Sequence, residues 1–235
     1  LGLWFLKQED LAHQNNFSKN EKMLLIVTAA LHDQAEAIIG DIPHGRKTNA
    51  ERKNEENILK IHESVFAPRI KGPLLKLYRT GRDSIAFNES TSKLPSAFRV
   101  IELIGFTKNA ITALKRLDEL EKHPLPTHQA KYLNIKTKQE QDLLIVRLNR
   151  LFADVFSCGV FSQLINLGVH FPTAHIFLRQ STTKINHGFN LIEESIFDWY
   201  SNGEDSTAAP DEKQRKVEAL KSEKKLWEEW IKNGN

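Results

Sequence analysis

Apolar residues recur every three or four positions along most of the chain, which is the spacing of one face of an α-helix. Few segments alternate apolar and polar residues as a half-buried strand would, and prolines separate the periodic segments. The pattern predicts helices over residues 22–39, 49–66, 94–120, 138–156, 189–200 and 211–232. We therefore expect an all-α fold.

The same pattern predicts three parts. Residues 1–202 read as one helical domain, residues 203–210 as a polar linker and residues 211–235 as a C-terminal amphipathic helix. Pro210 and the acids after it are helix-start signals, and Trp227 and Trp230 stand on a sparse apolar stripe among many charges. We expect this helix to dock on the domain or to join two copies of the chain. Because its charges alternate in sign, we expect no long nucleic acid as a partner.

The most informative segment, residues 32–43, places an imidazole and three carboxylates directly after an apolar run. On a helix His32 and Glu36 are four residues apart and share a face, with Asp33 beside them. Gly40 then ends the helix and leaves Asp41 on the turn. We expect a buried helix to deliver these groups to a cavity.

Imidazole and carboxylate together bind divalent first-row metals, which activate water and polarise phosphoryl oxygens. A carboxylate that does not bind the metal can deprotonate the water. The alternative is a plain helix end, with His32 hydrogen-bonded to a neighbour and the acids solvated. The full cluster favours hydrolysis at a metal site.

Residues 32–43 match the pattern His-Asp-x-x-Glu-x-x-x-Gly-Asp-hydrophobic-Pro at every fixed position. In this the chain resembles the HD-domain metal-dependent phosphohydrolases, most closely the YfbR-like 5'-deoxynucleotidases. The resemblance implies an HD-domain-like helical bundle, here with additional C-terminal helices, and a divalent ion such as Mn, Co, Fe or Mg. It makes His32 and Asp33 metal ligands, Glu36 the base for the attacking water and Asp41 a supporting acid.

Substrate contacts are expected just after the motif. By the same resemblance Lys47 meets phosphate, and Arg46 adds a second cation of the kind that holds phosphate oxygens. His44 is expected to line the site. The resemblance covers about the first half of the chain, residues 1–122, and assigns no role to residues 123–202.

Two metal ligands of the family lie outside the segment that matches residues 32–43. The family's first His lies on the preceding helix; His13 falls in a polar stretch that reads as a loop, so we expect that ligand upstream of Leu1. Where the family has a distal Asp, this chain offers Glu102 within an apolar run. Glu102 is expected to bind at or near the metal, or otherwise to form an ion pair with Arg99 or Arg116 or to face solvent.

The composition of the chain indicates what kind of protein it is and where we expect it in the cell. At 235 residues with 40% hydrophobic residues the chain can form a substantial core, and a single Cys158 excludes a disulfide framework. No apolar run is long enough to cross a bilayer, so we expect a cytoplasmic protein without a membrane partner.

The predicted function is metal-dependent removal of phosphate from a small, deoxynucleoside monophosphate-like nucleotide. The alternative is a degenerate HD domain that binds a nucleotide or protein without turnover.

Overall fold

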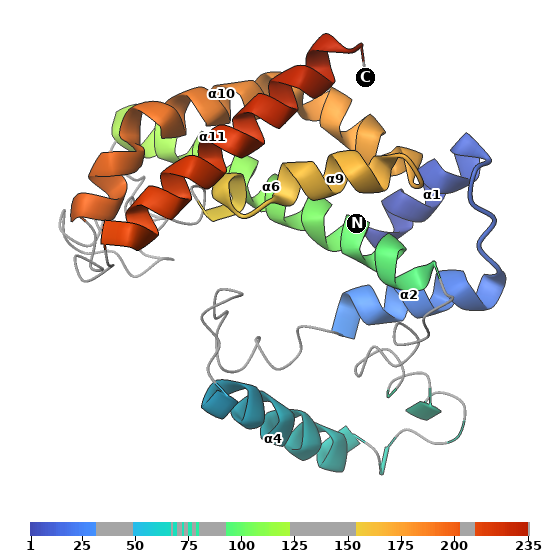
Figure 1. The fold of residues 1–235 in the computed structure, drawn as a ribbon. Helices are drawn as coiled ribbons and strands as arrows, with labels where there is room; N and C mark the ends of the chain where they lie inside the picture. The colour runs from blue at the N-terminus through green and yellow to red at the C-terminus, as the bar shows by residue number, and fades with distance from the viewer. Residues whose placement is uncertain are drawn as a thin grey trace. The chain divides into compact units, whose positions relative to one another are not determined.

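The computed structural model shows a protein built of helices and turns (Figure 1). It describes residues 1–31, 49–66, 93–122, 154–202 and 210–234, together with short pieces between residues 68 and 79. Throughout these ranges there is no strand. The predicted all-α fold class is confirmed.

The helices of the described ranges are, in chain order, α1 (Gly2–Ala12), α2 (Lys19–Leu31), α4 (Asn49–Phe66), α6 (Leu94–Lys122), α9 (Val160–Gly168), α10 (Pro172–Asn202) and α11 (Pro210–Lys232). The predicted bounds agree for α4, α6 and α11 to within two residues at each end. The sequence pattern did not predict α9 or the first half of α10.

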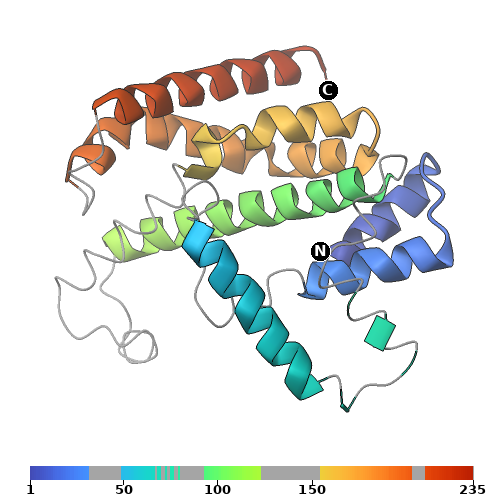
Figure 2. The same cartoon turned by 60° about the horizontal axis from the view of Figure 1, so that its bottom comes forward.

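The chain divides into two compact units, Leu1–Ile101 and Glu102–Asn235, with the boundary inside α6. In the first unit α1 and α2 form an antiparallel hairpin, best followed in Figure 2. Its core includes Phe5 and Leu25, both almost fully buried, and the Phe5 ring meets the edge of Phe17 at a centroid distance of 6.1 Å. The first unit thus gives α2 a packed support.

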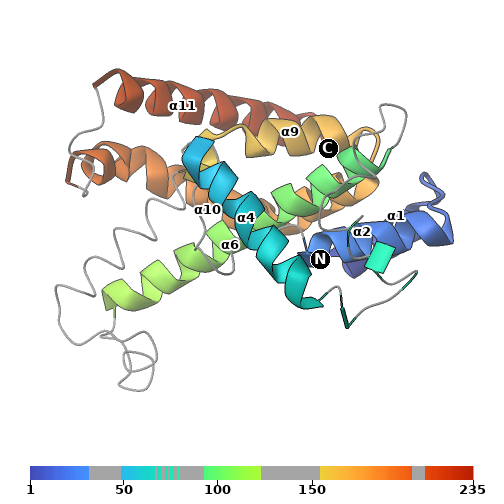
Figure 3. The same cartoon turned by 90° about the horizontal axis from the view of Figure 1, so that it is seen from below.

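In the second unit α9, α10 and α11 lie side by side, as the views in Figures 1 and 3 agree. Their shared core is an aromatic cluster that consists of Phe156, Phe161, Phe189, Trp227, Trp230 and His175. Neighbouring rings of the cluster stand 4.7 to 6.0 Å apart between centroids. Such pairs add specific geometry to the large apolar area that aromatic side chains bury.

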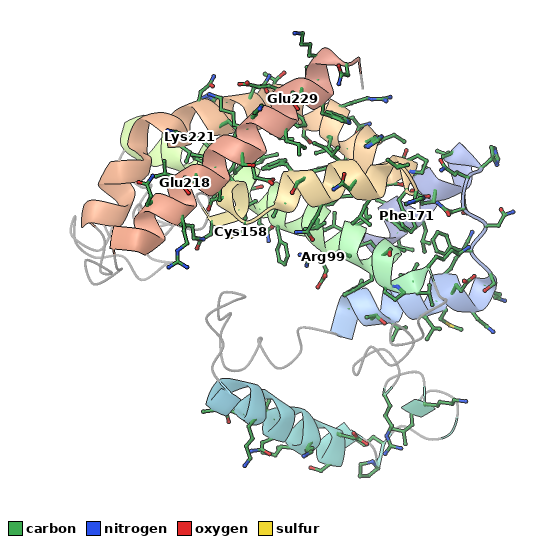
Figure 4. The ribbon with its side chains drawn as sticks, in the orientation of Figure 1. Arg99, Cys158, Phe171, Glu218, Lys221 and Glu229 are labelled. Atoms are coloured by element: carbon green, nitrogen blue, oxygen red, sulfur yellow. The ribbon has the colours of Figure 1, made fainter. Side chains whose placement is uncertain are left out.

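The C-terminal helix α11 docks on α9 and α10 through the predicted stripe. Val217, Leu220, Trp227 and Trp230 are each at most 6% exposed, whereas Glu218, Lys221 and Glu229 stand along the solvent side of the helix (Figure 4). Burying four such side chains supplies several kcal/mol at about 1.5–3 kcal/mol each. The prediction that this helix docks on the rest of the chain is confirmed. Within the described ranges no helix is both long and apolar enough to traverse a membrane.

Candidate functional site

The motif that carries the functional prediction begins one residue after α2 ends at Leu31. Most predicted site residues lie outside the residues that the structure describes: His32, Asp33, Glu36, Asp41, His44, Arg46 and Lys47. Their grouping around a metal stays a prediction. The part of the predicted helix 22–39 that is described, up to Leu31, is helical.

Helix α2, which leads into the motif, starts with a capping box. The Ser18 backbone N–H donates to Glu21 Oε2 at 2.7 Å, and the Glu21 backbone N–H donates to Ser18 Oγ at 3.3 Å. The two residues thereby satisfy donors that a helix start leaves without partners. Partial burial acts to raise the pKa of the Glu21 carboxyl, but the Ser18 hydrogen bonds and the Lys93 charge outweigh it, so that the pKa is lowered.

Helix α1 holds α2 at both ends. At one end Lys22 Nζ lies 2.7 Å from the Asp10 carboxylate. At the other, a Cβ added to Gly2 would stand 3.7 Å from Ala29 Cβ, which shows how closely the two backbones approach. The N-terminal end of α1 therefore lies against Ala29, three residues before His32.

His13, the histidine closest in sequence upstream of the motif, terminates α1. It adopts the left-handed conformation at φ 54° and is exposed, and the residues that follow it are not helical. The predicted loop between the first two helices is confirmed. His13 lies at the far end of the hairpin from Ala29.

The loop before α2 is held by two contacts that the sequence did not indicate. Glu9, on α1, is fully buried and accepts a hydrogen bond from Asn15 Nδ2 at 2.7 Å. Lys93 donates through Nζ to the Asn16 carbonyl and lies 4.3 Å above the centre of the Phe17 ring. These contacts fix the start of α2 and therefore its direction toward the motif.

Glu102, the predicted distal acid, is placed on α6. Its side chain is partly exposed, while its neighbours Ile101 and Leu103 are buried at 5% and 0% exposure. In the described ranges no three His, Cys, Asp or Glu side chains gather closely enough to hold a metal ion. Glu102 is therefore not part of such a group among those residues, and its metal role stays a prediction.

A further acidic residue, Glu223, is buried although it belongs to the highly charged helix α11. Glu223 is only 7% exposed, and its Oε2 accepts the backbone N–H groups of Phe161 and Ser162, each at 3.0 Å. It thus caps the first turn of α9 from another helix. The signal was present in the sequence, since Glu223 falls three residues after Leu220 and four before Trp227, on the apolar stripe.

A hollow of about 360 Å³ lies between α10 and α11. Phe189 and Trp227 form its floor, with Lys224, Glu228 and Lys232 along the α11 side. The two floor rings are each only 1% exposed, and Trp227 Nε1 already donates to Asn186 Oδ1 at 2.6 Å. The floor therefore offers little free surface to a ligand.

Comparison with protein-family models, with curated proteins and with solved structures gives no match to this chain.

Proposed function

We propose that this chain is a metal-dependent phosphohydrolase of the HD type that removes phosphate from a deoxynucleoside monophosphate-like nucleotide. The observation that carries the proposal is the complete motif over residues 32–43, where every fixed position of the family pattern is present. No other segment combines an adjacent His-carboxylate pair with a second acid one helical turn away.

The donor set suits a divalent first-row cation, because it joins a neutral imidazole to a carboxylate. His32 and Asp33 would hold the ion, which when bound would activate water and polarise a phosphoryl oxygen. Glu36 takes a proton from the attacking water as its oxygen forms the new bond to phosphorus. The bond to the nucleoside oxygen breaks, and that oxygen leaves as a hydroxyl with a proton that Asp41 helps to deliver. Lys47 and Arg46 hold the phosphate oxygens, with His44 beside them.

The first unit supports this proposal through the placement of α2. Its start is fixed by the capping box of Ser18 and Glu21, and its end lies against the start of α1 at Gly2. In the family another ligand comes from the helix before the motif helix. By the resemblance that helix would correspond to α1, whose N-terminal end lies against Ala29.

Metal content and phosphate release test the proposal together. The purified chain should contain a divalent metal by elemental analysis and release phosphate from deoxynucleoside monophosphates. His32→Ala and Asp33→Ala should lose the metal, and Glu36→Gln should keep it while turnover falls about a hundredfold or more. His13→Ala is the matched control, since His13 is exposed at the far end of α1 and should change neither quantity.

The second candidate, a nucleotide-binding HD domain without turnover, is favoured by one observation. Glu102 stands where the family has Asp, and its side chain is partly exposed on α6. If wild type binds metal and a deoxynucleoside monophosphate but releases no phosphate at any metal tested, the binding module is the correct reading. If His32→Ala retains the full metal content, the hydrolase proposal fails.

A further inference from the structure

The feature that carries a further inference is the cap that α11 places on α9. Helix α9 spans nine residues, its N-cap position is occupied by Gly159, and that residue provides no side-chain cap. The first turn of α9 contains no acidic residue either. A helix this short is marginal in water without outside support. The support at its start comes from Glu223, whose Oε2 accepts both the Phe161 and the Ser162 backbone N–H groups.

The same stretch of α11 covers the aromatic cluster. The Trp227 ring lies 6.0 Å from that of Phe161, which is itself fully buried and 4.7 Å from Phe156. Lifting α11 would therefore remove the cap from α9 and the cover from Phe161 in one step. When the carboxylate withdraws, the Phe161 and Ser162 N–H groups have only water as an acceptor, so that the first turn of α9 loses its cap.

The docked position of α11 also contains an unfavourable element. The Trp230 indole is 5% exposed, and its Nε1 has no hydrogen-bond partner among the described residues. A buried donor without an acceptor costs about 1–3 kcal/mol relative to one exposed to water. This cost is released when α11 lifts.

We propose that α11 is a strap whose lifting uncaps α9 and exposes the aromatic cluster, so that the first turn of α9 and α11 open as one unit while α10 stays folded. The inference does not depend on the proposed hydrolase activity, because it concerns residues of the second unit only. In this proposal α11 has a conformational role, because its displacement exposes an apolar surface at Phe156 and Phe161.

Native-state amide hydrogen exchange on the full chain, read residue by residue by NMR at increasing urea, tests the strap. The Phe161 and Ser162 amides are the direct probes, since their N–H groups are bonded to Glu223. Their protection should match that of the central α11 amides within a factor of about three and should stay clearly below that of α10. Slower exchange at Phe161 and Ser162 than in α11 would overturn the proposal, as would one common protection for all three helices.

Glu223→Gln adds a second arm. The amide oxygen still accepts but carries no charge, so exchange at Phe161, Ser162 and the α11 amides should quicken about tenfold. Glu229→Gln is the matched control on the same helix, where the exposed pair with Lys225 at 4.0 Å predicts a change of about twofold or less. Equal effects of the two variants would contradict the strap. If Glu223→Gln does not fold, the wild-type comparison decides alone.

Discussion

Gly168→Ala is expected to destabilise the second unit, because a side chain at this position meets the ring of His175. A Cβ on Gly168 would stand 1.9 Å from His175 Cδ2 and 2.2 Å from its Nε2. Carbon atoms in contact normally lie about 3.5–4.0 Å apart, so the ring would have to shift by roughly 1.5 Å. Gly168 ends α9 and His175 lies in the first turns of α10, so that the clash falls at the corner between the two helices.

The His175 ring has little freedom to make that shift. Its Nε2 lies 2.9 Å from the Ile165 carbonyl oxygen, which only accepts, so that Nε2 must donate. Its other side meets the Trp230 ring at a centroid distance of 5.3 Å. Moving the ring breaks the hydrogen bond, worth about 0.5–1.5 kcal/mol, and overpacks the corner at about 1–3 kcal/mol. A helix-propensity gain of at most about 1 kcal/mol for alanine offsets part of this. The expected net loss is about 2 kcal/mol.

Urea denaturation followed by circular dichroism at 222 nm measures this loss as a lower midpoint. Gly2→Ala is the matched control, because its Cβ would lie 3.7 Å from Ala29 Cβ, an ordinary contact, and stability should change by less than about 0.5 kcal/mol. The double variant Gly168→Ala with His175→Ala removes the clash. It should be more stable than the two single effects predict by about 1 kcal/mol or more. Gly168→Ala with wild-type stability, or strict additivity in the double variant, would refute the reasoning.

The remaining predictions concern α2 and α11. Ser18→Ala removes one side of the capping box and should cost about 0.5–2 kcal/mol by urea denaturation, with no loss for Ser222→Ala on the exposed side of α11. Because the folded pKa of Glu21 is lowered, its carboxylate stabilises the fold above the ordinary glutamate pKa of about 4.3 and stops doing so as the pH falls through the folded value. The stability difference between wild type and Glu21→Gln should therefore be present at neutral pH and vanish in acid; a constant difference would contradict it. Deleting residues 203–235 should lower the thermal midpoint while metal content stays the same, and unchanged stability would mean that α11 contributes nothing.

The helices that the sequence predicted well are those in which apolar residues repeat with clear start and end signals. Pro210 and the acids that follow it mark the start of α11, and the described helix begins at Pro210. The start of α2 was predicted three residues late. Its capping box at Ser18 and Glu21 is a recognised start signal, but it precedes the apolar run, and the prediction followed the apolar run instead.

Helix α9 and the start of α10 were missed for a different reason. The segment 160–168 contains no charged residue, and its polar face consists of Ser162, Gln163 and Asn166 alone, so that its helical period is short and was not recognised. His170, Phe171 and Pro172 then read as a break, and they do form the corner between the two helices. What makes the corner tight is the contact between Gly168 and the His175 ring, a relation between two helices that no pattern within either one contains.

The functional residues show the same difference between a pattern within one segment and a contact between two helices. The chemistry of residues 32–43 was readable because a pattern of residue types at fixed spacing is a property of one segment, and it remains the basis of the proposed activity. The cap by Glu223 could not be predicted from the sequence, because the N–H groups that donate to its carboxylate belong to a helix about 60 residues earlier in the chain. A carboxylate on an apolar stripe indicates only that some hydrogen-bond donor must lie close to it. The donor turned out to be the unprotected start of α9, which is why α11, although it is the last helix in sequence, determines how an earlier one begins.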